Sequence, residues 1–233
     1  MKTIAIMQPY FLPYIGYFQL LAAVDKFIVL DDVNYINRGW INRNRLLLNG
    51  VAHTFTVPLR GASQNRLICE IELDDNQGWR EKLLRTIRQA YGKAPCYTQI
   101  SALLESLINY PSTRLDEFIL NSLREITRYL SLEVDIVNTS RIYENSHLKG
   151  QDRILAICQQ ECANVYINPI GGMDLYDRSG FAARELSLYF LCSRPISYSH
   201  GKGEHVPWLS IIDVLMFNEP SVVRKLLAET DLV

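Results

Sequence analysis

Compact apolar runs alternate along the chain with longer segments in which apolar residues recur every three or four positions. The compact runs predict strands at residues 3–7, 26–30, 134–137, 165–168 and 188–191. The helical spacing predicts helices at residues 13–24, 79–91, 100–108, 113–130, 152–163, 208–217 and 221–229. Strands that alternate with helices are typical of a parallel sheet covered by helices. We therefore predict an α/β fold with a mostly parallel sheet of nucleotide-binding type.

Three consecutive helices interrupt this alternation and form a predicted helical insertion at about residues 79–130. Gly92 ends the first of them, and Pro111 ends the second. Thr113 is the expected N-cap of the third, with Asp116 three residues further on. Ser210 is the expected N-cap of the helix that follows it, and Asp213 is the expected second residue of a capping box. Because no linker divides the chain, we expect residues 1–233 to form a single α/β domain.

Two further segments alternate polar and apolar residues, which is typical of strands with one polar face. They cover residues 53–58 and 66–73. We expect these two segments to pair as a hairpin at the edge of the sheet.

The balance of acidic and basic residues limits the kinds of molecule that the protein is expected to bind. The chain has 24 Lys and Arg against 25 Asp and Glu, a formal net charge of −1. Broad nucleic-acid binding needs a basic surplus, so it is not expected, although a local basic pocket remains compatible with this balance. Residues 1–7 do not resemble a secretory signal, and no apolar run reaches the roughly 18 residues of a membrane span. Five scattered cysteines without a CxxC pair argue against zinc and indicate free thiols. We expect a cytoplasmic protein.

The first chemically informative segment, residues 8–18, joins the first predicted strand to the first helix. Ligands of open α/β sheets bind at this edge, and helix N-termini favour phosphate. Tyrosine rings offer stacking faces and hydroxyl groups. The alternative is that these rings only pack a tight corner. The candidate ligand-binding residues are Gln8, Tyr10, Tyr14 and Gly16, and Tyr17 is the candidate hydrogen-bond donor to a reacting group.

The second segment, residues 31–45, follows the second strand and combines carboxylates with three arginines and several asparagines. Arginine forks match phosphate oxygens. Asp32 is the candidate general base, and the two aspartates could also accept sugar hydroxyls or hold Mg²⁺ through water. The alternative is a solvated run in which aspartates pair with arginines. The candidate ligand-binding residues are Asp31, Arg38, Asn42, Arg43, Asn44 and Arg45.

The third segment follows the strand at residues 165–168 and contributes Asn168, Gly171 and Gly172. Paired glycines allow backbone N–H groups to face a ligand. His200 and His205 flank a glycine-rich stretch, for which a lid over the ligand is favoured over a metal site. No GxSxG elbow, Walker A loop or GxGxxG fingerprint occurs.

The motifs at residues 7–17, 30–33, 42–44, 168–172 and 209–213 resemble those of the WbqC-like family. This resemblance implies a role in the synthesis of bacterial surface polysaccharide, such as the O-antigen of lipopolysaccharide. A more distant similarity is to nucleotidylyltransferases and pantothenate synthetase. There a His-x-Gly-His signature occupies the place of Tyr14-Ile15-Gly16-Tyr17, and tyrosine supplies no positive charge near neutral pH.

Together these features indicate a group-transfer enzyme, a candidate transferase that moves an acyl or aminoacyl group to a nucleotide-linked amino sugar. The alternatives are a non-catalytic module that binds a nucleotide sugar, and adenylyl transfer. The expected partner is a small phosphate-bearing ligand, with a nucleotide or nucleotide sugar and Mg²⁺ as candidate cofactors, and a homo-oligomer is compatible with the sequence. All of this assumes that Tyr17, Arg43 and Gly172 line one cavity.

Overall fold

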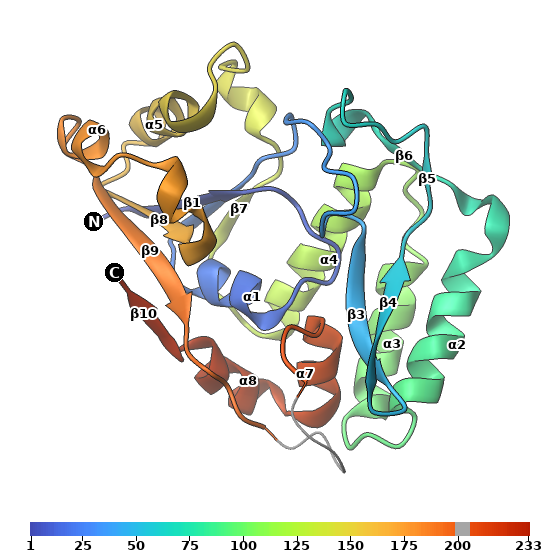
Figure 1. Ribbon diagram of the computed structural model, residues 1–233. Helices are drawn as coiled ribbons and strands as arrows, with labels where there is room; N and C mark the ends of the chain where they lie inside the picture. Colours follow the sequence, from blue (N-terminus) through green and yellow to red (C-terminus); the bar gives the residue numbers. More distant parts are fainter. Residues whose placement is uncertain (199–205) are drawn as a thin grey trace.

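The computed structural model describes residues 1–198 and 206–233 and contains a six-stranded central sheet (Figure 1). The strand order is β10-β9-β8-β1-β2-β7; β10 is antiparallel to β9, and the other neighbours are parallel. The predicted α/β fold with a mostly parallel sheet is therefore confirmed, while β10 was not predicted. The strands are β1 (Thr3–Met7), β2 (Lys26–Val29), β7 (Asp135–Val137), β8 (Val165–Pro169), β9 (Ser187–Ser193) and β10 (Thr230–Leu232).

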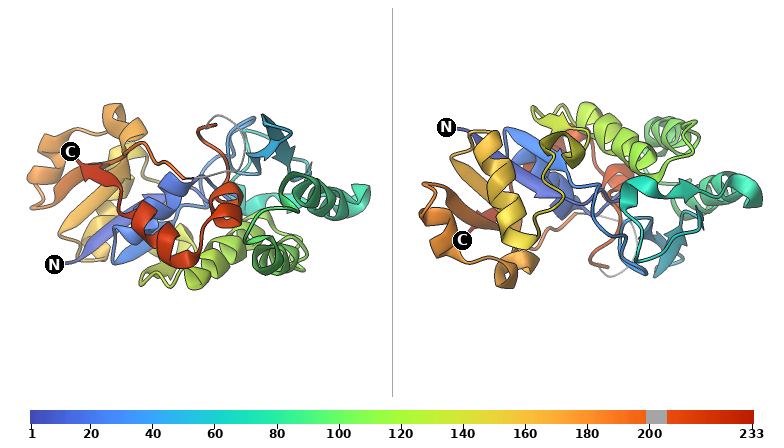
Figure 2. Two further views of the ribbon diagram at one scale, coloured as in Figure 1. Left: turned by 90° about the horizontal axis from the view of Figure 1, so that it is seen from below. Right: turned by 90° about the horizontal axis from the view of Figure 1, so that it is seen from above.

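Each central strand sends alternate residues to opposite faces of the sheet, because the side-chain period of a strand is two. In β1, Ile4 and Ile6 pack into one apolar cluster and Ala5 packs into the other. The sheet thus separates two layers of helices (Figures 1 and 2). One layer holds α5 (Gly150–Gln160) and α6 (Arg178–Ala182), and the other holds α1 (Ile15–Ala22), α4 (Leu115–Tyr129) and α8 (Pro220–Leu227).

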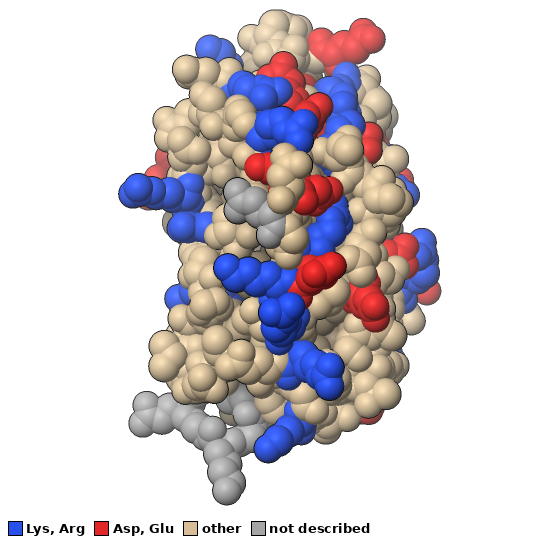
Figure 3. All heavy atoms as spheres, turned by 90° about the vertical axis from the view of Figure 1, so that its right-hand side faces the viewer, with Lys and Arg blue, Asp and Glu red and all other residues tan. Residues whose placement is uncertain are grey.

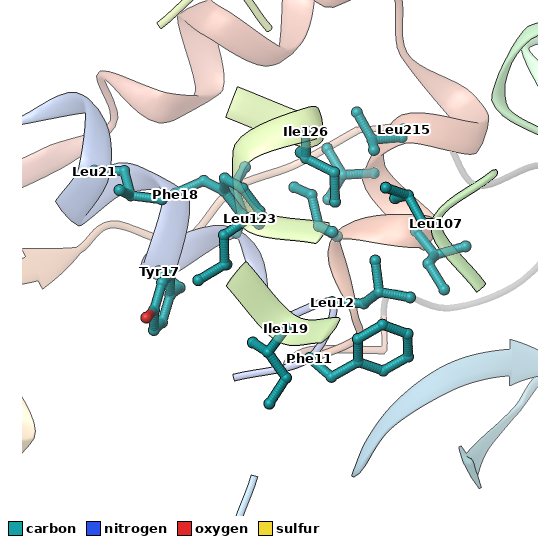
Figure 4. Packing of buried hydrophobic residues seen from close by; sticks show 14 of the residues in the cluster. Phe11, Leu12, Tyr17, Phe18, Leu21, Leu107, Ile119, Leu123, Ile126 and Leu215 are labelled. Atoms are coloured by element: carbon teal, nitrogen blue, oxygen red, sulfur yellow. The ribbon is translucent and has the colours of Figure 1, made fainter. Parts of the chain in front are cut away.

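The larger apolar cluster joins α1 and α4 to the centre of the molecule (Figure 4). Phe18 of α1 and Leu123 of α4 are fully buried, and Leu215 of α7 (Ile211–Phe217) closes the cluster at its far side. Each such side chain contributes about 1.5–3 kcal/mol through its removal from water. The helix α1, which directly follows residues 10–14, is therefore held firmly by its apolar face.

The long connection between β2 and β7 contains the predicted helices and two small antiparallel ribbons. The Tyr91 hydroxyl accepts a hydrogen bond from the Leu47 amide at 2.8 Å, which fixes the first helix against a ribbon. Basic and acidic side chains are interleaved on the face that carries this helix (Figure 3). The elements are β3 (Arg43–Leu48), β4 (Val51–Thr56), β5 (Leu59–Arg60), β6 (Glu72–Leu73), α2 (Trp79–Tyr91), α3 (Tyr97–Ile108) and α4.

The predicted hairpin between residues 53–58 and 66–73 is wrong. β4 pairs with β3, while residues 66–73 hold a 3₁₀ turn and β6, which pairs with β5. Asn49 and Gly50 form the two-residue turn between β3 and β4, with φ angles of 52° and 79°. An Asn-Gly turn with two positive φ angles is favoured in hairpins, so this dipeptide was the signal for the true partner.

The predicted cap of α4 is also wrong, whereas that of α7 is partly confirmed. Arg114 occupies the N-cap position of α4, and no side chain caps this helix. Ser210 does cap α7, since its side chain accepts a hydrogen bond from the Ile212 amide. The Asp213 carboxylate accepts hydrogen bonds from the hydroxyls of Tyr91 and Tyr198.

Across residues 1–198 and 206–233, none of the helices has the length and apolar character needed to cross a membrane. The five cysteines are free. The remaining elements are 3₁₀ turns: η1 (Ile68–Glu70), η2 (Asp75–Gln77), η3 (Ser140–Tyr143) and η4 (Ile170–Leu175).

The partly buried carboxylate of Glu161 links stability to pH. Burial opposes its ionisation, but hydrogen bonds from Lys2, Tyr143 and Lys26 outweigh this effect and lower the pKa of Glu161 to about 2. Because the folded-state pKa lies below the unfolded value, this contribution to stability is complete above about pH 5.5 and is lost as the pH falls towards 2.

We expect Glu161→Gln to reduce the free energy of unfolding at pH 7 by about 1–3 kcal/mol. The penalty should shrink by about 1 kcal/mol at pH 3.5, because the wild-type carboxylate then contributes less. Urea unfolding at both pH values measures this. Asp135→Asn is the control: its side chain is 64% exposed, so its pairing with Lys26 adds little. A penalty for Glu161→Gln that is equal at both pH values would contradict the assignment.

Candidate functional site

Three segments far apart in the sequence meet at the carbonyl group of Leu12, beyond the end of β1. This oxygen accepts hydrogen bonds from Asn44 Nδ2 at 2.9 Å and from Ser210 Oγ at 2.6 Å. The next carbonyl, of Pro13, accepts from the Ile211 amide at 2.8 Å. Residues 10–14, the start of β3 and the start of α7 are therefore held side by side.

Two adjoining cavities lie at this junction. The first, called the polar chamber here, has a volume of about 340 Å³ and the second, called the apolar chamber, about 320 Å³. The polar chamber is lined by Tyr10, Pro13, Tyr14, Trp40, Asn44, Arg45 and Trp208. The apolar chamber is lined by Tyr14, Ile15, Ser193, Arg194, Pro195, Ile196, Tyr198, Val206, Pro207, Trp208, Leu209 and Val214.

Tyr14 and Trp208 form the wall between the chambers. Their rings meet edge to face, with centroids 5.4 Å apart and an angle of 63°. The Tyr14 ring also lies over Gly16, where a Cβ atom would be 2.3 Å from it. Burial raises the pKa of Tyr14, and a hydrogen bond with Ser193 offsets part of this increase. The hydroxyl therefore stays protonated at neutral pH, and the ring covers the start of α1.

Arg45 supplies the charge of the polar chamber and Trp40 its stacking face, while Arg43 lies outside the lining but contacts the same ring. The guanidinium carbons of Arg43 and Arg45 lie 5.4 and 5.6 Å from the centre of the Trp40 ring. Arg45 Nη2 donates to the Trp208 carbonyl at 3.2 Å, which ties the two sides of the chamber together. Arg45 lines the chamber, and among the described residues its side chain contacts the Trp40 ring and the Trp208 carbonyl. Its positive charge therefore favours an anionic ligand at this wall.

Tyr17 was predicted to face a reacting group but belongs to the core, whereas the predicted ligand-binding residue Gln8 is half-buried. The Tyr17 side chain is 4% exposed, and its hydroxyl donates to the Gln8 carbonyl at 2.9 Å. Burial, followed by the nearby Tyr10, raises the pKa of Tyr17 well above its ordinary value. Because its hydroxyl is used within the protein, Tyr17 has no place in the function proposed below.

Asp31 and Asp32 lie in a buried ionic cluster at the end of β2, away from the lining residues of both chambers. Asp32 Oδ1 accepts from Arg153 Nη2 at 2.6 Å and also from Ser140 Oγ. Arg153 is itself buried. This arrangement matches the alternative in which aspartates pair with arginines, although the partner comes from α5 rather than from residues 38–45.

The Asp31 side of this cluster connects the sheet to the helical insertion. Asp31 Oδ1 accepts from Thr139 Oγ1 at 2.8 Å, and Arg141 Nη2 lies 3.3 Å from Asp31 Oδ2 and 3.4 Å from Asp116 Oδ2. Burial raises the pKa of Asp31, and these partners offset only part of that effect. Within the described parts of the chain, no group of three or more His, Cys, Asp or Glu side chains could hold a metal ion.

Asn42 and Asn168 use their polar groups inside the protein. Asn42 accepts from the Tyr35 hydroxyl and donates to the Val57 carbonyl, both at 2.7 Å. Asn168 accepts from the Tyr166 hydroxyl at 3.0 Å and approaches Gly172 so closely that a Cβ there would be 2.1 Å from its Nδ2.

The remaining predicted residues lie at the surface or outside the described ranges. Gly171 and Arg38 are exposed, and Arg38 adopts a positive φ of 59°. His200 and His205 lie outside the described residues. The lining residues of the two chambers include Tyr10, Tyr14, Asn44 and Arg45 but not Tyr17, Arg43 or Gly172, so the expected single cavity is replaced by a smaller site around residues 10–14.

Sequence reasoning missed the two tryptophans that shape this site. Trp40 and Trp208 are 42% and 61% exposed, and Trp208 adopts a positive φ of 62°. Each directly follows a glycine or proline, at Gly39 and Pro207, and Trp208 was assigned to the start of the predicted helix at residues 208–217, which in the structure begins only at Ile211. A large aromatic residue directly after such a chain breaker was the available signal.

A double-mutant cycle tests whether Gly16 exists to admit the Tyr14 ring. Gly16→Ala should destabilise the protein by about 1–3 kcal/mol because the added methyl group displaces this ring. In a Tyr14→Ala background the same change should stabilise the protein by up to about 1 kcal/mol, the ordinary helix preference of Ala over Gly. Thermal or urea unfolding of the four proteins measures the coupling. Equal effects in both backgrounds would contradict the packing described.

The ionic cluster generates a second prediction. Arg153→Ala should lower the free energy of unfolding by about 3–5 kcal/mol, since it leaves the Asp32 carboxylate buried and unpaired. Asp32→Leu combined with Arg153→Met should recover most of this loss, because the double variant removes both charges of the pair and leaves neither partner unpaired. Urea unfolding compares the variants. If the double variant were no more stable than Arg153→Ala, the pair would not be the cause.

Comparisons with known proteins identify relatives of this chain. The profile of the WbqC-like protein family matches residues 8–225. An uncharacterized protein of Mycobacterium tuberculosis is 30% identical over 222 residues, covering 94% of each chain. Comparison with solved structures found no significant match. The family resemblance noted in the motifs is thereby confirmed: the chain belongs to the WbqC-like protein family.

Proposed function

We propose that this protein binds a nucleotide-linked sugar in the polar chamber and acts in the synthesis of bacterial surface polysaccharide. The observation that carries the proposal is the pairing of the Arg45 guanidinium with the Trp40 ring in the lining of one cavity, with Arg43 on the same ring. A nucleotide sugar combines a flat base with a diphosphate. Aromatic faces stack on bases with about 1–3 kcal/mol each, and arginine pairs with phosphate oxygens.

The reaction class that we propose is transfer of an acyl or aminoacyl group to the amino group of the sugar. In such a step the amine nitrogen forms a bond to the carbonyl carbon of an acyl donor, such as a thioester. The bond from this carbon to the leaving thiolate breaks, and the amine loses a proton. The surface-polysaccharide setting that the family resemblance implies supports this class, because amino sugars carry acyl groups there.

A non-catalytic binding module is the second candidate. It is favoured by the engagement of both predicted catalytic side chains: Asp32 pairs with Arg153, and Tyr17 donates to a backbone carbonyl. Adenylyl transfer has less support, because Tyr17 lies in the core where that signature places a second histidine.

Calorimetric titration with UDP-N-acetylglucosamine, free UDP and free N-acetylglucosamine tests the binding. We expect Arg45→Ala to weaken binding of UDP-N-acetylglucosamine by about 10–100-fold, since a charge-assisted hydrogen bond contributes about 1.5–3 kcal/mol. Trp40→Ala should weaken binding of both UDP ligands, and added salt should weaken the phosphate contact.

Arg85→Ala, at an exposed arginine of α2, is the matched control and should leave affinity unchanged. Equal affinity of wild type and Arg45→Ala, or no binding of any UDP ligand, would refute the proposal. Incubation with an amino-sugar nucleotide and an acyl thioester, followed by mass spectrometry, separates the enzyme from the module.

A further inference from the structure

The apolar chamber differs from its neighbour in the side chains that line it. Its lining residues come from α1, α7 and the chain that leaves β9, elements that are labelled in Figure 1. Aliphatic side chains predominate, among them Ile15, Ile196, Leu209 and Val214. Its volume of about 320 Å³ is close to the 340 Å³ of the polar chamber, so the lining distinguishes the two, while the volume limits the length of the group that can enter.

The polar groups among its described lining residues are engaged within the protein. Arg194, its one charged lining residue there, donates from Nε to Asp231 Oδ2 at 2.9 Å and also lies near Glu229. The Tyr198 hydroxyl donates to Asp213 Oδ2 at 2.7 Å. A phosphate or a sugar would thus find its hydrogen-bonding partners already committed, whereas an apolar group would lose nothing on entry.

The two chambers share a wall but differ in what they offer a ligand. Tyr14 and Trp208 line both, and Arg45 holds the Trp208 carbonyl from the polar side. On one side of this wall Arg45 can pair with a charged or hydrogen-bonding group. On the other side the aliphatic lining can pack against an apolar group. Two reactants of opposite character can therefore be brought to either side of the same pair of rings.

We infer that the apolar chamber binds the acyl chain of a donor, next to the nucleotide-linked sugar in the polar chamber. This inference rests on the proposed function and names its second substrate class: a short aliphatic acyl group, rather than an amino acid with a charged side chain or a second sugar. The Tyr14–Trp208 wall then separates the chain from the nucleotide.

Titration with N-acetylcysteamine thioesters of acetyl, butanoyl, hexanoyl and decanoyl groups tests this. Each added methylene that enters the chamber should tighten binding about fourfold, until the chamber is full. Methylenes beyond the length that fills the chamber should add no further affinity. A profile that does not change with chain length, or tighter binding of a charged aminoacyl thioester, would overturn the inference.

Ile196 provides variants that change the chamber in both directions. Ile196→Trp should remove the dependence on chain length, and Ile196→Ala should move the optimum to a longer chain. Val222→Trp, at an exposed position of α8, should change neither. Circular dichroism checks that each variant is folded. If Ile196→Trp does not fold, the test rests on Ile196→Ala, whose preferred chain length should become longer.

UDP-N-acetylglucosamine binding is measured on the same proteins and distinguishes the two proposals. Its persistence in wild type with no dependence on chain length would refute the acyl chamber and retain the proposed function. Dependence on chain length without any nucleotide-sugar binding would refute the nucleotide site and retain the acyl chamber.

Discussion

One backbone oxygen, that of Leu12, organises the candidate site. It accepts hydrogen bonds from Asn44 and Ser210, which belong to β3 and to the start of α7. Leu12 itself adopts a φ of 45°, a left-handed conformation that is rare for a residue with a branched side chain. Buried polar groups must be satisfied, so both partners are required where they stand. The walls of the two chambers are set by this junction rather than by the sheet.

The carboxyl edge of the sheet therefore contains two regions of different character. At the end of β2, the buried Asp31 and Asp32 pair with Arg141 and Arg153, and these ion pairs join the sheet, α5 and the helical insertion. Beyond the end of β1, Arg45 and Trp40 line a cavity. The ion pairs of the first region hold elements together. The second region presents a positive charge and an aromatic surface to a cavity, which is why it carries the functional proposal.

The regular elements were predictable because their signals are local. The apolar spacing of α2, α3 and α4 and the compact runs of the central strands depend only on neighbouring residues. Alternation in residues 53–58 indicated a strand but could not identify its partner, because alternation reports which face is buried and not which strand lies alongside. The roles of Asp32 and Trp208 depended on Arg153 and Tyr14, which are distant in sequence. Nothing near either residue encodes that contact.

The order of strands in the sheet has a consequence for how the chain is made. β1 lies between β2 and β8, and Thr3 is paired with Val165, so the middle of the sheet cannot close until most of the chain has left the ribosome. Contacts between residues so distant in sequence slow folding. During translation β1 and β2 present an open, apolar edge, a surface on which nascent chains aggregate and chaperones act. Synthesis of this protein should accordingly benefit from low temperature and from chaperones that cover this edge until β8 has been made.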